Sequence, residues 1–225
     1  MKIGILGTGI VGTTIGGKLV ERGHEVMLGS RTADNAKATA WAERLATQSA
    51  QPGSAKHGTF ADAAAFGDIV FLCTAGSAAL EVLRLAKADN IGGKILVDLT
   101  NPLSFSVKST PTLYISGGVN SLAEQIQKAV PAARVVKTLN TVTADVMVNP
   151  SLVAGDHDMF IAGNDERAKA QVKTLLHEEF GWNTLYDLGD LSGARAMEGY
   201  LLLWLRLWGT LGTPNFNLKI LRSIS

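Results

Sequence analysis

The stretch Lys2-Ile-Gly-Ile-Leu-Gly-Thr-Gly-Ile-Val-Gly12 decides the fold of this chain. Its first part, Lys2–Leu6, is an apolar run with the length and composition of a buried strand. The glycines that follow, Gly7, Gly9 and Gly12, have the spacing G-x-G-x-x-G. In a strand–turn–helix unit the first glycine permits a tight turn, the second lets the backbone approach a pyrophosphate, and the third lets the helix pack closely on the strand. The sequence therefore predicts a dinucleotide-binding turn at its start.

Apolar runs of strand length alternate with longer stretches of helical period along the rest of the chain, which is typical of βαβ units. This pattern predicts a Rossmann-type α/β fold, a doubly wound parallel sheet with a small C-terminal α/β or helical appendage. The predicted strands are Lys2–Leu6, Glu25–Leu28, Ala55–Gly58, Asp68–Thr74, Lys94–Leu99, Arg134–Leu139, Met159–Ala162 and Thr184–Leu188. The predicted helices are Ile10–Glu21, Ala33–Thr47, a helix capped by Thr59 with Asp62 in its first turn, Ser77–Ala88, Ser121–Ala129, Asp165–Glu179 and Ala194–Trp208.

We expect two domains. Residues 1–145 form the nucleotide-binding domain, and residues 146–225 form a small part packed on the sheet that serves substrate binding or dimerisation. The segment Phe105–Val119, rich in Ser, Thr, Gly and Pro, is predicted to be a mobile loop. Loops of that length in compact domains are often functional.

The residues after the second strand, Gly29-Ser30-Arg31-Thr32, indicate which dinucleotide binds. Proteins of this fold that use NAD carry an acidic residue there, which hydrogen-bonds the ribose 2′-hydroxyl. Here the Ser30 hydroxyl and the Arg31 guanidinium suit the oxygens of a 2′-phosphate instead. The sequence therefore favours NADP(H) over NAD(H). Lys37, on the next helix, either adds a second positive charge to this site or is an ordinary solvated helix residue.

Composition and charge restrict the partners of the chain. A formal net charge of +1 without a run of Lys or Arg lacks the basic footprint of a nucleic-acid or anionic-membrane binder. The single cysteine, Cys73, lies in an apolar run and is expected to fill core space, as in a cytoplasmic protein. No secretory signal is expected ahead of the first strand. The apolar run Tyr200–Trp208 is too short to span a membrane, and we expect it to be buried or to face a second subunit in a homodimer.

Side chains for proton transfer or metal binding are scarce. The four histidines, His24, His57, His157 and His177, have no metal-ligand spacing, and none is positioned as a general acid. We therefore assign no catalytic residue and no metal site. Asp187 and Asp190 are expected to flank a turn and to cap the last helix rather than act as bases, with Ser192 favoured as the N-cap. Tyr200, Trp204 and Trp208 fall on one helix face, which packs in the core or a dimer interface, or lines a pocket for a flat aromatic substrate.

Several of these segments together resemble a known family. They are the Gly7–Gly12 turn, Gly29-Ser30-Arg31, Asp98-Leu-Thr-Asn-Pro102, Val135-Val-Lys-Thr-Leu-Asn-Thr141 and Asp187-Leu-Gly-Asp-Leu-Ser-Gly-Ala-Arg195. Along almost its whole length the chain resembles the NADPH-dependent reductases of the deazaflavin coenzyme F420, whose relatives include the oxidoreductase domains of membrane metalloreductases. The resemblance implies that the nicotinamide and a flavin-like ring stack in the cleft between the Rossmann domain and the C-terminal part.

The resemblance also implies site residues. Those implied at the pyrophosphate are Thr8, Gly9, Ile10 and Val11; at the 2′-phosphate Ser30 and Arg31; beside the cofactor Thr74 and Gly76; and at the nicotinamide end Thr100, Asn101, Asn140 and Ala144. The chain departs from the family in two places. It has the small residues Ala75–Ala79 after the fourth strand where family members have bulky ones, and it has Asn140 where deazaflavin reductases have histidine. Both departures alter the walls of the pocket for the second substrate.

The function that follows is hydride transfer between NADP(H) and a ring, with F420, FMN or FAD as the second substrate. Such a transfer needs two planar rings held face to face, and little from side chains. Two alternatives stay open. One is an NADP(H)-binding sensor or regulatory module without catalysis. The other is a carbonyl or imine reductase, which requires a placed acid and a long helical dimerisation domain.

Overall fold

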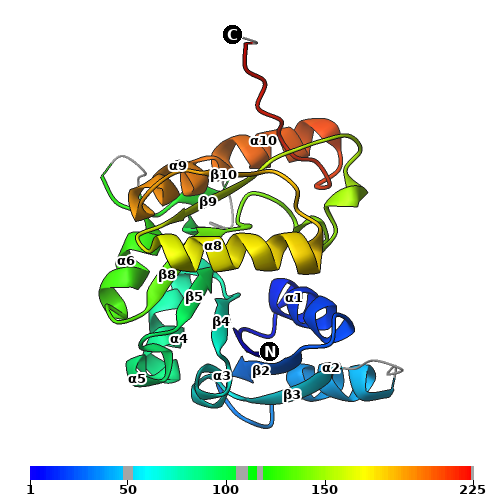
Figure 1. Ribbon diagram of the computed structural model, residues 1–225, viewed down its shortest axis with the longest axis vertical. Coiled ribbons are helices and arrows are strands. Elements are labelled where there is room, and N and C mark those ends of the chain that lie inside the picture. The colour runs from blue at the N-terminus through cyan, green and yellow to red at the C-terminus, as the bar shows by residue number, and fades with distance from the viewer. Residues whose placement is uncertain (48–52, 105–110, 116–118, 224–225) are drawn as a thin grey trace.

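The computed structural model describes residues 1–47, 53–104, 111–115 and 119–223. Its centre is an eight-stranded sheet with the strand order β10-β9-β8-β5-β4-β1-β2-β3 (Figure 1). From β8 to β3 all neighbouring strands run parallel, whereas β9 pairs antiparallel with β8, and β10 runs parallel to β9. The predicted Rossmann-type α/β fold is therefore confirmed, with an antiparallel edge added to the parallel sheet.

The first half of the chain supplies five of these strands and the helices that connect them. Its elements are β1 (Lys2–Leu6), α1 (Ile10–Glu21), β2 (Glu25–Ser30), α2 (Ala36–Thr47), β3 (Ser54–Thr59), α3 (Phe60–Phe66), β4 (Ile69–Leu72), the 3₁₀ turn η1 (Gly76–Ala78), α4 (Ala79–Ala86), α5 (Ala88–Ile91) and β5 (Ile95–Asp98).

The second half completes the sheet and adds a small hairpin. Its elements are β6 (Leu103–Ser104), β7 (Thr112–Leu113), α6 (Leu122–Ala129), β8 (Arg134–Thr138), α7 (Ala144–Val148), η2 (Pro150–Leu152), β9 (Met159–Gly163), α8 (Glu166–Leu175), the π-helical turn η3 (Leu176–Phe180), β10 (Leu185–Asp187), η4 (Leu191–Gly193), α9 (Ala194–Gly199) and α10 (Leu201–Leu211). The division at residues 145 and 146 stays a prediction, and the sheet passes across it because β9 and β10 join the same eight strands.

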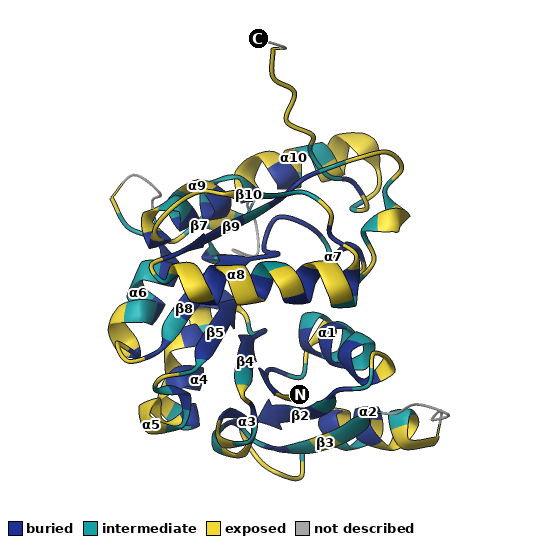
Figure 2. Ribbon diagram, in the orientation of Figure 1, coloured by how far each residue is buried: buried dark blue, intermediate teal, exposed yellow. Residues whose placement is uncertain are grey.

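Helices cover both faces of the sheet, so its central strands are buried on each side, whereas the edge strands β3 and β10 are only partly buried (Figure 2). Successive strand residues point to opposite faces. In β4, for example, Phe71 belongs to the core that includes residues of α1, α2, α7 and α8, whereas Val70 and Leu72 belong to the core that includes residues of α3, α4 and α6. Cys73 is buried on the Phe71 side, as predicted. Two separate hydrophobic cores therefore fix the sheet between two helical layers.

Several predicted boundaries are wrong by a few residues for local reasons. β2 continues to Ser30 rather than ending at Leu28, and α2 begins at Ala36 rather than Ala33. The helix predicted over Ser77–Ala88 is divided into η1, α4 and α5. The break between α4 and α5 lies at Lys87, which adopts a left-handed φ of +65° that no α-helix continues through. The helix predicted over Asp165–Glu179 changes at Leu176 into the π-helical turn η3.

For two helical segments, the capping residue predicted from the sequence can be compared with the one in the structure. The Thr59 hydroxyl accepts from the Asp62 backbone N–H at 3.1 Å and the Asp62 carboxylate accepts from the Thr59 N–H at 2.9 Å, so the predicted cap of α3 is confirmed as a full capping box. The prediction that Ser192 caps the last helix is wrong. Asp190 caps the 3₁₀ turn η4, and its carboxylate accepts from both the Ser192 N–H and the Ser192 hydroxyl, whereas the N-cap of α9 is Gly193.

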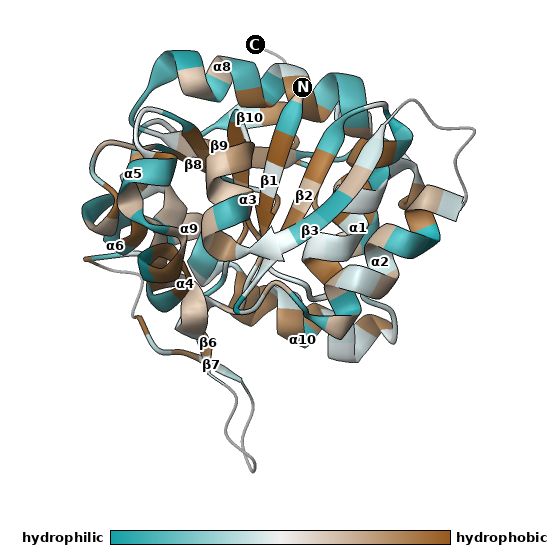
Figure 3. Ribbon diagram, turned by 90° about the horizontal axis from the view of Figure 1, so that it is seen from below, coloured by the Kyte–Doolittle hydropathy of each residue, from teal (hydrophilic) through white to brown (hydrophobic). Residues whose placement is uncertain are grey.

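The loop predicted over Phe105–Val119 lies largely outside the described residues. Within it, β7 pairs antiparallel with β6 and forms a two-stranded hairpin. Figure 3 shows this hairpin and α10 on the side toward which β1 runs, beyond the carboxyl ends of the parallel strands. The predicted C-terminal helix is also corrected: it is divided at Tyr200 into α9 and α10, and α10 runs on to Leu211. Among the described residues, no helix is long and apolar enough to cross a membrane.

Tyr200 and Trp204 belong to a third, smaller hydrophobic cluster with Phe216 and the hairpin. The rings of Trp204 and Phe216 stack with centroids 5.5 Å apart, and Trp204 is buried. Trp208, one turn further, is 44% exposed. The aromatic face of α10 is therefore core at its beginning and surface at its end.

Candidate cofactor-binding site

The parallel strands bring the predicted site residues to one edge of the sheet. Strands β1, β2, β4, β5 and β8 run in the same direction, so the residues that follow each of them lie at the same carboxyl edge. The chain winds from β1 through β2 to β3 on one side, and from β4 through β5 to β8 on the other. The winding reverses between β1 and β4. In open α/β sheets, ligands bind outside the carboxyl ends of strands at such a switch point.

The three glycines after β1 differ in what surrounds them. Gly7 has a φ of +134°, and a Cβ added there would lie 2.4 Å from the Cys73 carbonyl oxygen. A Cβ at Gly12 would lie 2.2 Å from the Gly7 carbonyl oxygen, inside the turn itself. A Cβ added at Gly9, by contrast, would have no atom of the described residues beyond its chain neighbours within 4 Å. Packing therefore requires Gly7 and Gly12, whereas Gly9 leaves open space above the backbone, where a phosphate group fits.

Helix α1 begins directly at this open position. Gly9 is its N-cap and provides no side-chain acceptor for the N–H groups of the first turn. Those N–H groups and the positive end of the helix dipole favour an anion. Ile10, in the first turn, is 77% exposed, and Thr8 is partly exposed. Thr8, Gly9, Ile10 and Val11 thus form an accessible surface in front of the helix.

At the end of β2, the two residues expected at a 2′-phosphate have different environments. Ser30 is buried, and its hydroxyl donates to the Thr32 carbonyl oxygen. Arg31 is exposed and forms no hydrogen bond or ion pair with another described residue. The Arg84 guanidinium, and to a smaller extent the charge of Arg31, hold the pKa of the Glu81 carboxyl below its usual value. Arg31 would therefore break no hydrogen bond or ion pair within the described part of the chain in order to bind a phosphate.

Lys37 is exposed on the second residue of α2. Lys37 would be exposed both as a second positive charge at the 2′-phosphate site and as an ordinary solvated helix residue. Its position therefore does not decide between these two predicted roles. Its contribution stays a prediction.

On the other side of the switch point, a line of contacts connects the remaining residues. A Cβ on Gly7 would lie 3.3 Å from Thr74 Cγ2, and one on Gly76 would lie 2.1 Å from the Asn101 carbonyl oxygen. The Asn101 side chain in turn donates to the Asn140 carbonyl oxygen at 2.9 Å. The loops after β4, β5 and β8 are therefore in contact with one another. Ala144 follows on the same side, as the first residue of α7.

The loop after β8 has an unusual backbone. Leu139 has a φ of +61°, a left-handed conformation that is costly for a residue with a branched side chain. The turn redirects the chain immediately before Asn140, which is 2% exposed. The strained backbone conformation is therefore at Leu139, the residue directly before Asn140.

Beneath Thr100 and Asn140 lies a buried charge cluster that the sequence did not reveal, the Asp98–Lys137–Glu198 cluster. Lys137 Nζ lies 3.0 Å from Asp98 Oδ2 and 3.1 Å from Glu198 Oε1, and it donates to the Thr100 carbonyl oxygen. Asp98 accepts from both the N–H and the hydroxyl of Thr100. Glu198 accepts from the Leu122 and Ala123 N–H groups at the start of α6. One signal was available: Lys137 is the only charged residue inside the apolar run Val135–Leu139.

A cavity of about 590 Å³ opens beside Gly76. It lies between α4, α6 and the β6–β7 hairpin, and Tyr114 borders it. Burial, and then the charges of Glu198 and Asp98, raise the pKa of the Tyr114 hydroxyl. The residues that line the cavity are Gly76, Ser77, Leu80, Leu103, Ser104, Tyr114, Leu122 and Gln125. The small residues after β4 thus leave room next to the nicotinamide end of the candidate site.

The histidines lie apart from this edge or are engaged elsewhere. His57 pairs with the Ala33 carbonyl oxygen, His157 with that of Pro150, and His177 with that of Trp182. His24 lies 3.0 Å from the Glu179 carboxylate. Among the described residues, no group of three or more His, Cys, Asp or Glu side chains is arranged to hold a metal ion.

The fold and this carboxyl-edge site define the class of Rossmann-type dinucleotide-binding proteins. The family model "NADP oxidoreductase coenzyme F420-dependent" matches residues 2–102. The chain is 30% identical over 203 residues to the F420-dependent NADP reductase of Methanocaldococcus jannaschii, covering 88% of each chain. It is 29% identical over 208 residues to the metalloreductase STEAP3 of Rattus norvegicus, covering 92% of this chain and 38% of that protein.

Among solved structures, one from Arthrobacter sp. FB24, described as a candidate F420-dependent NADP reductase, has a TM-score of 0.89 and 45% identity. The match covers 99% of this chain and 100% of the other. The chain belongs to the F420-dependent NADP reductase family, and the resemblance found in its sequence is confirmed.

Proposed function

We propose that this protein is an NADP(H)-dependent oxidoreductase that transfers a hydride between the nicotinamide and a deazaflavin ring of the F420 type. The observation that carries the proposal is the family match over nearly the whole chain, together with the open glycine turn at the switch point. The dinucleotide supplies a hydride that the deazaflavin accepts, or the reverse. The chain's own residues bind and align the two partners.

The residues present fit NADP(H). Gly9 leaves space for the pyrophosphate in front of α1, whose first turn has no side-chain cap. Arg31, without a partner among the described residues, would meet the 2′-phosphate, and Ser30 would accept or donate beside it after its hydroxyl turns away from Thr32. Thr74, Gly76, Thr100, Asn101, Asn140 and Ala144 would border the nicotinamide end, where their loops meet.

The cavity beside Gly76 supports a flat second substrate. Its apolar walls, Leu80, Leu103 and Leu122, suit a ring system, and Ser77 and Tyr114 supply hydroxyl groups. We extend the proposal to FMN and FAD as weaker second substrates, because they present a ring of the same shape. The imine or carbonyl reductase alternative is not favoured by the family to which the chain belongs.

Rapid mixing of the NADPH-loaded protein with F420, FMN or FAD tests the reaction. We expect NADPH to be oxidised fastest by F420, with matching loss of the deazaflavin absorbance. If none of the three oxidised NADPH although NADPH bound, the redox proposal would fall and the sensor alternative would take its place. If NADH bound as tightly as NADPH, the cofactor assignment would fall instead.

We further propose a homodimer. Helix α10 exposes Leu202, Leu203 and Leu211 by 46%, 52% and 53%, next to the half-exposed Trp208. An apolar surface of this kind is commonly covered by a symmetric partner. A cytoplasmic location is also a proposal, supported by a lone cysteine that is buried in the core; fractionation of cells producing the protein would test it.

A further inference from the structure

Asn140 carries a buried acceptor without a partner. The residue is 2% exposed, and its Oδ1 atom forms no hydrogen bond with any other described residue. Buried polar atoms are nearly always paired, and an unpaired one lowers stability. An orphaned oxygen at the candidate nicotinamide end therefore points to a ligand that completes it.

The neighbouring hydrogen bonds fix which atom of the Asn140 amide is the oxygen. Asn101 Nδ2 donates to the Asn140 main-chain carbonyl at 2.9 Å, so Asn101 Oδ1 must be an acceptor. Asn140 Nδ2 donates to that oxygen at 2.9 Å and to the Met197 carbonyl at 3.1 Å. Turning the amide over would place its oxygen against two acceptors. Both amide protons are therefore used, and only Oδ1 remains for a donor.

The surrounding structure holds this amide rigidly. Lys137 donates to the carbonyl of Thr100, the residue before Asn101, and pairs with Glu198, the residue after Met197. Both acceptors of the Asn140 amide are thus anchored to the same buried ammonium group. Together with the left-handed Leu139, this arrangement presents Oδ1 in one fixed position.

We propose that Asn140 Oδ1 accepts a hydrogen bond from the carboxamide N–H of the nicotinamide, and so sets the orientation of the ring for hydride transfer. The assignment rests on the proposed function. The carboxamide is the only N–H donor of the nicotinamide group, and Asn140 is in contact with Asn101 at the end of the site where that group would lie. The residue is a binding and positioning group, and it neither gives nor takes a proton.

An equilibrium titration without deazaflavin tests the assignment. The probes are NADPH and its 3-acetylpyridine analogue, in which a methyl group replaces the amide nitrogen. We expect the wild-type protein to bind the analogue on the order of tenfold more weakly, as for one lost hydrogen bond. In Asn140→Leu the two dinucleotides should bind within about twofold of each other. Equal binding of both by the wild-type protein overturns the assignment, whether or not the variant folds.

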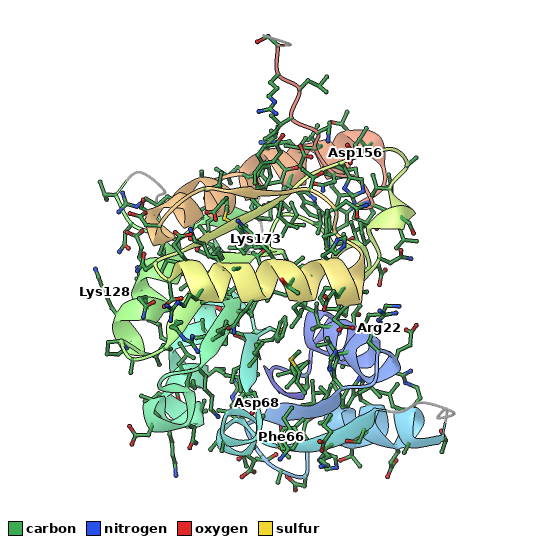
Figure 4. The ribbon with its side chains drawn as sticks, in the orientation of Figure 1. Arg22, Phe66, Asp68, Lys128, Asp156 and Lys173 are labelled. Carbon is green, nitrogen blue, oxygen red and sulfur yellow. The ribbon has the colours of Figure 1, made fainter. Side chains whose placement is uncertain are left out.

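The matched control is Gln171→Leu, which also replaces an amide by an apolar group of similar size. Gln171 is exposed on α8 and lines one surface cavity with Asp68. Asp68 precedes β4 and so lies at the amino edge of the sheet (Figure 4). This variant should keep the wild-type preference for NADPH over the analogue. If it lost the preference as Asn140→Leu does, the effect would not be specific to Asn140, and the assignment would fall.

A second arm separates the carboxamide from the ring N–H of a deazaflavin, the other donor expected at this edge. The probe is a deazaflavin methylated at that nitrogen, titrated into the dinucleotide-free protein. We expect its affinity relative to the unmethylated ring to be unchanged by Asn140→Leu. Asn140→Leu could instead change the affinity ratio of the two deazaflavins and keep the preference for NADPH over its analogue. Oδ1 would then bind the second ring, and the carboxamide assignment would be wrong. Failure of NADPH to bind at all would overturn the proposed function as well.

Discussion

Lys137 Nζ lies 3.0 Å from Asp98 Oδ2, and neither side chain has any exposed surface. The pair joins two neighbouring strands just beneath the site, and Glu198 links it to α6 and α9. Burying charges is costly, but removing one member of a paired set leaves the other charges uncompensated. The cluster is therefore a rigid base for the loops that follow β5 and β8.

The first prediction concerns that base. Lys137→Met should lower the free energy of unfolding by about 3–5 kcal/mol, because Asp98 and Glu198 would stay buried without a counter-charge. Chemical denaturation measures it. Lys173, on α8 (Figure 4), forms a partly exposed ion pair with Asp187 of β10, and Lys173→Met should lower the free energy of unfolding by about 1 kcal/mol or less. Equal losses in the two variants would show that burial does not distinguish the pairs.

The glycine turn gives a second prediction. Gly9→Ala should fold with a stability within about 1 kcal/mol of the wild-type value, because the site is open and its φ of −80° suits alanine. It should nevertheless bind NADPH at least roughly tenfold more weakly, since the methyl group would occupy the pyrophosphate position. Gly12→Ala should instead lose about 2–3 kcal/mol of stability through its clash with the Gly7 carbonyl.

Gly17→Ala is the control for both variants, because Gly17 lies on the same helix and nothing is within 4 Å of its added Cβ. It should raise stability by about 0.5–1 kcal/mol and leave NADPH binding alone. If Gly9→Ala bound NADPH as tightly as the wild-type protein, the assignment of the pyrophosphate to this turn would be wrong.

Arg31 carries the third prediction. Arg31→Ala should weaken NADPH binding by about 1.5–3 kcal/mol, roughly ten- to hundredfold, and should leave NADH binding unaffected because NADH lacks the 2′-phosphate. Calorimetric titration with each dinucleotide measures the difference. Arg167→Ala, an exposed arginine on α8, serves as the control for a simple change in net charge. An equal loss of affinity for NADPH and NADH would argue against a 2′-phosphate contact.

Acid stability gives the fourth prediction, through Asp187. Burial opposes its ionisation, but hydrogen bonds from Lys173 and Lys169 outweigh burial and hold the pKa at about 2. Because the folded-state pKa lies below the ordinary value of 3.8, this group stabilises the fold above about pH 4 and loses that contribution as the pH falls toward 2. Asp187→Asn should remove this contribution and lower the free energy of unfolding on the order of 1 kcal/mol, a small value because solvent screens the ion pairs of Asp187.

Unfolding free energies measured from pH 5 to pH 2 test this window. The difference between wild type and Asp187→Asn should shrink as the pH falls. Asp34→Asn, an exposed aspartate without an ion pair among the described residues, should show no such convergence. A pH-independent difference for Asp187→Asn would contradict the assignment.

The fifth prediction concerns the face of α10. Leu203→Glu should convert a dimer into a monomer without unfolding it, because Leu203 is 52% exposed in the single chain but would be buried between two copies. Light scattering coupled to gel filtration gives the mass. Arg167→Glu, at an exposed residue of α8, tests whether any added charge has this effect. A wild-type mass of one chain would refute the dimer directly.

The sequence predicted the first third of the fold closely, because its signals there are local. The run Lys2–Leu6 and the helix Ile10–Glu21 have the predicted bounds, and the Thr59 capping box needs only residues three apart. One boundary that was wrong depends on a single backbone state, the left-handed Lys87 that ends α4. No side-chain pattern specifies such a state for a lysine.

The candidate site divides in the same way. By itself, the sequence determined the parallel sheet, the glycine turn and the absence of an acid after β2, because strand period, glycine spacing and residue type can be read without neighbours in space. Only the tertiary structure decided that Asn101 and Asn140 share two hydrogen bonds and that Glu198 pairs with Lys137. It also decided that no described residue donates a hydrogen bond to Asn140 Oδ1. These residues are 39 to 61 positions apart, and only the packing of β5, β8 and α9 brings them together.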